Sequence, residues 1–84
     1  MKELANKYID MGITFLNGEY ADEYPDKKEN EVYKGLETII EIEETPENPK
    51  EFISELAEEI QKDNRVYFAE CFSSKEYLLR INFA

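Results

Sequence analysis

The sequence has no histidine and no tryptophan, and its single cysteine is Cys71. The absence of histidine removes the commonest general base and the commonest ligand for transition metals. A lone cysteine cannot form an internal disulfide, and without histidine it is a poor candidate for a catalytic nucleophile or a zinc ligand. We therefore expect no catalytic, cofactor or metal site, and we do not expect an enzyme.

Glycine and proline are scarce, with three residues of each. The glycines are scattered, so the chain has no glycine-rich loop for binding phosphate. No apolar run is long enough to span a membrane, and the N-terminal residues lack the apolar stretch of a secretory signal. These absences predict a cytoplasmic protein without a membrane segment, including the host-cell cytoplasm if the protein is phage-encoded.

Basic residues are half as numerous as acidic ones, 10 against 20, and the formal net charge is −10. Residues 19–59 hold 15 of the acids but only four of the bases, so the whole excess lies in the middle of the chain. Such a field repels nucleic acid and anionic membranes and attracts basic surfaces. We therefore expect no direct binding of nucleic acid. Solubility alone is the other interpretation of this charge.

The apolar pattern of residues 3–16 predicts a helix, with one stripe formed by Leu4, Tyr8, Met11 and Phe15 and by Ala5, Ile9 and Leu16 alongside them. Gly18 would end this helix in a left-handed conformation, although residues 17–18 also fit a hairpin turn. Residues 19–30 show no sustained period and are expected to form a loop. Residues 31–43 alternate between apolar and polar side chains, which predicts a half-buried strand with acidic residues outward.

A second helix is predicted after Asn48, where Asn48, Pro49 and Glu51 fit a capping box. Its buried stripe would contain Phe52, Ile53, Leu56, Ala57 and Ile60. Residues 65–72 and 77–83 are expected to pair as two strands. If Phe72 lies opposite Tyr77, the apolar face carries Val66, Phe68, Glu70, Phe72, Tyr77, Leu79, Ile81 and Phe83. That register puts the Glu70 carboxylate on the apolar face, so either Glu70 is paired or lies at the sheet rim, or the register is different.

These elements predict one acidic α+β domain over residues 1–84, a two-layer α-β-α-β-β arrangement. A three-stranded sheet would carry both helices on one face, and its other face would be open to solvent. The predicted core consists of Leu4, Tyr8, Met11, Phe15, Leu36, Ile40, Phe52, Leu56, Ile60, Phe68, Leu79 and Ile81.

Three acidic clusters are the candidate partner-binding residues. The first cluster, on the open sheet face, consists of Glu37, Glu41 and Glu43. The second, on the second helix, consists of Glu51, Glu55, Glu58 and Glu59. Within the second cluster only Glu58 has a compensating lysine, Lys62. The third, in the loop, contains Glu19, Asp22, Glu23, Asp26 and Glu29 together with Tyr20 and Tyr24. Tyrosine is enriched at protein interfaces and stacks on arginine, which favours a basic protein as the partner.

Rigidly spaced carboxylates can imitate a row of phosphates. In size and charge the chain resembles phage-encoded inhibitors, such as anti-CRISPR and antirestriction proteins, and the acidic immunity proteins of nuclease toxins. The resemblance implies an inhibitor that occupies the basic surface of a nuclease or another nucleic-acid-binding protein. The alternative is an interaction or assembly module that uses an apolar patch or a strand edge.

Overall fold

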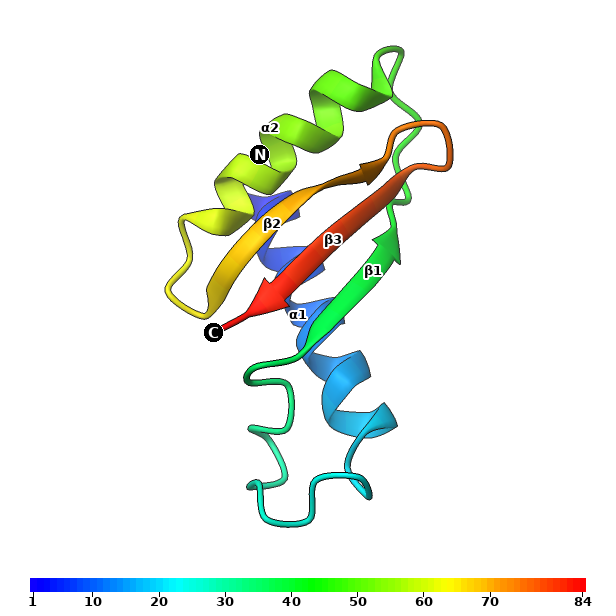
Figure 1. Ribbon diagram of the computed structural model, residues 1–84. Coiled ribbons are helices and arrows are strands. Elements are labelled where there is room, and N and C mark those ends of the chain that lie inside the picture. Colours follow the sequence, from blue (N-terminus) through cyan, green and yellow to red (C-terminus); the bar gives the residue numbers. More distant parts are fainter.

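The computed structural model describes residues 1–84 and has an α+β fold, in which two helices cover one face of a three-stranded antiparallel sheet (Figure 1). The elements are α1 (Lys2–Glu19), β1 (Glu37–Glu41), α2 (Pro49–Gln61), β2 (Val66–Ser73) and β3 (Leu78–Phe83). The strand order is β1-β3-β2, so the last strand in the chain is central. The predicted fold class and element order are confirmed. Neither helix is long and apolar enough to cross a membrane.

Helix α1 is longer than predicted, because it continues through residues 17–18 to Glu19. The predicted stop at Gly18 and the alternative hairpin there are both wrong. The Asn17 side chain accepts a hydrogen bond from the Tyr33 backbone N–H at 2.9 Å, and Leu16 is fully buried, so the last turn is held in helical form. The glycine with positive φ is Gly35, at +80°, just before β1.

The buried face of α1 is rotated relative to the prediction. Gly12 is buried, and a Cβ atom there would lie 3.0 Å from the Phe83 ring and 3.2 Å from Cγ2 of Thr38. Helix α1 therefore approaches the sheet most closely at Gly12, which leaves Met11 and Phe15 at the side with 38% and 52% exposure. The α1 residues that are buried are Ala5, Tyr8, Ile9, Gly12 and Leu16.

The two other glycines give a matched pair of stability predictions. Gly18→Ala is expected to stabilise the protein by about 0.5–1 kcal/mol, because the site is helical and a Cβ atom meets nothing within 4 Å. Gly35→Ala is expected to destabilise it by about 1 kcal/mol, because its φ is in the left-handed region. Urea midpoints measure both changes. A midpoint for Gly18→Ala below the wild-type value would contradict the helical assignment.

Strand β1 is shorter than the predicted strand over residues 31–43. Backbone hydrogen bonds from Lys34 to Glu31 (3.2 Å) and from Leu36 to Tyr33 (3.0 Å) make residues 31–36 a series of turns. Similar turns occupy residues 20–31, so the loop extends over residues 20–36 and projects from one end of a molecule that measures 43 × 23 × 17 Å (Figure 1). Glu43 lies beyond the end of β1 and is not part of the sheet.

The predicted pairing of β2 with β3 holds at Val66 and Phe83 but is wrong beyond that point. An irregularity between Val66 and Phe68 inserts Tyr67 and shifts the register by one residue, as a β-bulge does. Glu70 consequently lies opposite Arg80 on the uncovered face, which avoids burying an unpaired carboxylate. The side chains of Phe68 and Phe72 share that face, while Ala69 and Cys71 lie opposite Ile81 and Leu79.

The core lies between the sheet and the helices. Among the residues predicted for it, Tyr8, Leu56, Ile60, Leu79 and Ile81 are buried, and Leu4, Leu36, Ile40 and Phe52 are partly buried. Met11, Phe15 and Phe68 are exposed instead, and Ile9, Leu16, Ile53, Ala69 and Phe83 fill the interior. Helix α2 begins as predicted, because the Asn48 side chain accepts a hydrogen bond from the Glu51 N–H at 3.3 Å and Pro49 is the first helical residue.

Candidate functional site

The three acidic clusters do not merge into one face. The loop over residues 20–36 forms one end of the long axis, and α2 lies toward the opposite end, beside β2 (Figure 1). The remaining cluster is on or near β1, between them. Each cluster is therefore a separate surface and has to be considered by itself.

The sheet cluster is largely neutralised by neighbouring cations. Oε2 of Glu37 lies 3.6 Å from Nε of Arg80, and Glu43 forms an ion pair with Lys7 of α1. Only Glu41 of the three has no ion-pair partner. The cluster thus offers one unpaired carboxylate rather than a row of three.

The α2 cluster contains a row of carboxylates that have no ion-pair partner. Lys62 pairs with Glu59 at 3.1 Å, so the expected compensation of Glu58 is wrong. Glu51, Glu55 and Glu58 are exposed and have no cation within ion-pair distance. They are spaced by four and three residues and therefore share one helix face. We call these three residues the α2 acidic stripe.

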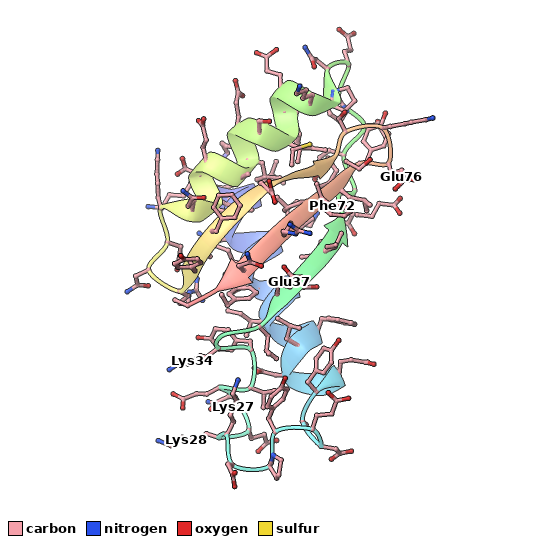
Figure 2. The ribbon with its side chains drawn as sticks, in the orientation of Figure 1. Lys27, Lys28, Lys34, Glu37, Phe72 and Glu76 are labelled. Atoms are coloured by element: carbon pink, nitrogen blue, oxygen red, sulfur yellow. The ribbon has the colours of Figure 1, made fainter.

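In the loop cluster the acids are exposed, and both tyrosines contact other residues of the protein. Glu19, Asp22, Glu23, Asp26 and Glu29 are all exposed. Tyr20 is partly buried against the core, and the Lys27 ammonium lies 4.6 Å from the centroid of the Tyr24 ring. The same ammonium donates hydrogen bonds to the carbonyls of Val32 (3.2 Å) and Lys34 (2.6 Å), so Lys27 holds the loop together. In Figure 2, Lys28 and Lys34 project outward from this end.

The uncovered sheet face carries an aromatic patch that the sequence analysis missed. Phe68, Phe72 and Ile39 are 38%, 46% and 42% exposed there. Arg80 lies between them, with its Nη1 atom 3.0 Å from Oε2 of Glu70 and its guanidinium 4.7 Å from the Phe72 ring centroid. Figure 2 labels Glu37 and Phe72 at opposite ends of this face. Aromatic residues with arginine are typical of interface cores.

Three polar side chains outside these surfaces, those of Tyr8, Asp63 and Cys71, have shifted pKa values with local causes. The Tyr8 hydroxyl donates to Oε1 of Glu44 at 2.5 Å and accepts from the Glu43 N–H at 2.8 Å, and burial raises the pKa of this phenol. Hydrogen bonds from the Arg65 guanidinium lower the pKa of Asp63. Burial raises the pKa of the Cys71 thiol, which favours its protonated form at neutral pH.

No three side chains among cysteine, aspartate and glutamate lie close enough together to hold a metal ion. Comparisons with protein-family models, with curated proteins and with solved structures found no match for this chain. What the arrangement offers chemically is a set of surfaces: the α2 acidic stripe, the acidic loop end and the aromatic sheet face.

Proposed function

We propose that this chain is a cytoplasmic acidic binding protein that inhibits a nuclease or another nucleic-acid-binding protein by occupying its basic surface. The α2 acidic stripe carries the proposal, because three exposed carboxylates on one helix face have no cation of their own. The helix rise separates successive charges by about 5 Å along the axis. This is of the same order as the axial rise of roughly 3.4 Å per phosphate on one strand of duplex DNA.

Affinity capture with an amide variant tests this proposal. The wild-type protein and Glu51→Gln/Glu55→Gln/Glu58→Gln are immobilised and exposed to nuclease-treated lysate of the cells in which the protein occurs. We expect a nucleic-acid-binding protein to elute from the wild type as salt rises, since exposed charge pairs are screened. The triple variant should retain about one tenth as much or less, if each charge contributes near 0.5 kcal/mol or more.

A matched control removes three charges from the other end of the molecule. Glu19→Gln/Asp22→Asn/Glu23→Gln alters the net charge by the same amount and leaves α2 intact. Equal losses in both triple variants would mean that capture depends on net charge alone. Undiminished capture by the α2 variant would exclude the stripe as the contact surface. Added DNA should displace the captured protein, because the proposal places carboxylates in a nucleic-acid site.

The aromatic sheet face supports a second candidate function, a protein-interaction or assembly module. Exposed apolar area rimmed by charged residues is typical of interaction sites. This candidate predicts association that salt does not weaken and that Phe72→Ser reduces. Sedimentation of the purified protein over a range of concentrations tests it, and a monomeric mass at every concentration would exclude self-assembly.

A further inference from the structure

Strand β1 has a free edge with unpaired backbone groups. The Leu36 carbonyl accepts the Phe83 N–H at 2.9 Å, and the Ile42 N–H donates to the Tyr77 carbonyl at 2.9 Å. Because hydrogen-bonded residues alternate along an antiparallel pair, residues 38 and 40 also direct their N–H and C=O groups toward β3. The backbone groups of residues 37, 39 and 41 therefore point away from the sheet, at an edge that no other strand covers.

An apolar groove runs beside this edge on the helix side. It has a volume of about 290 Å³ and is lined by Met11, Phe15, Thr38, Ile39, Ile40 and Glu41. Met11 and Phe15 are the two α1 residues that the rotation of the helix leaves exposed. The free hydrogen-bonding groups and the apolar groove thus lie next to each other along the same strand.

We propose that the β1 edge binds an extended segment of a basic protein partner, which adds to the sheet as a fourth strand. The basic character of the partner rests on the function proposed above. Glu41 has no cation of its own, and the Glu37 side chain is still 56% exposed beside Arg80. Residues opposite these two carboxylates would be lysine or arginine, since opposite charges across a strand pair are favourable. Residues opposite Thr38 and Ile40 would direct apolar side chains into the groove, because side chains alternate between the faces of a strand.

A second copy of this chain fits the edge poorly. Antiparallel self-pairing centred on Ile39 would set Glu37 of each copy directly opposite Glu41 of the other. Like charges in that position are destabilising, and the pairing would contain two such contacts. The same spacing of carboxylates around an apolar centre suits a segment of the form basic-apolar-x-apolar-basic, read in either direction.

A labelled peptide tests the inference directly. The probe is a nine-residue fluorescent peptide with the sequence Lys-Val-Thr-Val-Lys at its centre and glycine and serine at its ends. It is titrated into the purified full chain, with fluorescence anisotropy for affinity and amide chemical shifts for position. We expect saturable binding, with the largest shifts at residues 37–41 and at Met11 and Phe15. A peptide with glutamate in place of both lysines should bind about tenfold more weakly or worse.

Two variants of the protein separate strand addition from general attraction to basic peptides. Ile39→Pro removes an outward N–H at an edge position, where proline is tolerated, and Phe15→Ser alters the groove at an exposed helical site. Each variant should lower the affinity for the peptide by about tenfold or more, which is the loss typical of a truncated interface anchor. The α2 stripe variant Glu51→Gln/Glu55→Gln/Glu58→Gln should bind the peptide as the wild type does.

The outcomes distinguish the two proposals. Strand addition at β1 would be overturned if the peptide changed the amide chemical shifts mainly in α2 or in residues 20–36. Equal affinity for the glutamate peptide would overturn it as well. The inhibitor function would still stand if the α2 variant lost its captured partner. Peptide binding at β1 without salt-sensitive capture by α2 would instead support strand addition and count against the phosphate-mimic mechanism.

Discussion

Replacing Ala69 with aspartate is expected to unfold the protein, whereas replacing the neighbouring Phe68 with aspartate leaves it folded. Ala69 is 6% exposed and lies opposite Ile81 on the helix-covered face, and Phe68 is 38% exposed on the uncovered face. An unpaired buried charge costs several kcal/mol. This is a large part of the total stability of about 4–13 kcal/mol that a chain of this length has.

Far-ultraviolet circular dichroism with urea titration measures the difference. The Ala69→Asp variant should lack a cooperative transition or show a greatly lowered midpoint, and Phe68→Asp should unfold near the wild-type midpoint. The opposite ranking would mean that β2 pairs without the irregularity after Val66, since that register exchanges the two faces.

Replacing Tyr8 with phenylalanine is expected to lower the free energy of unfolding by about 2–4 kcal/mol. The Tyr8 side chain is fully buried, and its hydroxyl joins α1 to the segment after β1 through Glu43 and Glu44. Without the hydroxyl, the Glu43 N–H loses its partner, and the Glu44 carboxylate loses a hydrogen-bond donor, while the Lys7 ammonium remains 3.6 Å away. Phenylalanine retains the ring, so the change isolates the hydrogen bonds from the packing.

Tyr67→Phe is the matched control, because Tyr67 is 77% exposed. Its free energy of unfolding, measured by urea titration, should stay within about 0.5 kcal/mol of the wild-type value, as is usual for surface substitutions. If Tyr8→Phe and Tyr67→Phe have the same free energy of unfolding, the contacts of the Tyr8 hydroxyl contribute no net stability.

The parts of this fold that could be predicted are those governed by local pattern. Helix α2 follows from its cap at Asn48 and from an apolar stripe with a period of 3.6, both of which lie within the element. The order of elements and the two-layer arrangement follow from the same periodicities. The rotation of α1 could not be read in this way, because Gly12 faces Thr38 and Phe83, which are distant in sequence.

The candidate surfaces were harder to predict than the fold, because they depend on which ion pairs form and on the exact register of β2. Lys62 has Glu58 and Glu59 at four and three residues' distance, and only the structure identifies Glu59 as its partner. The aromatic sheet face depends on one extra residue near the start of β2. The anomaly of Glu70 in the simplest register was the one signal in the sequence that indicated this shift.

The central position of β3 has a consequence for how the chain folds during synthesis. Strands β1 and β2 each pair only with β3, which is the last of the three to be made. Until residues 78–83 have left the ribosome, neither earlier strand has a partner within the sheet. Pairing of β1 must then close a loop of about 40 residues, and such distant contacts slow folding. The nascent chain therefore holds two unpaired strands among its charged segments, and the sheet forms only after β3 has been translated.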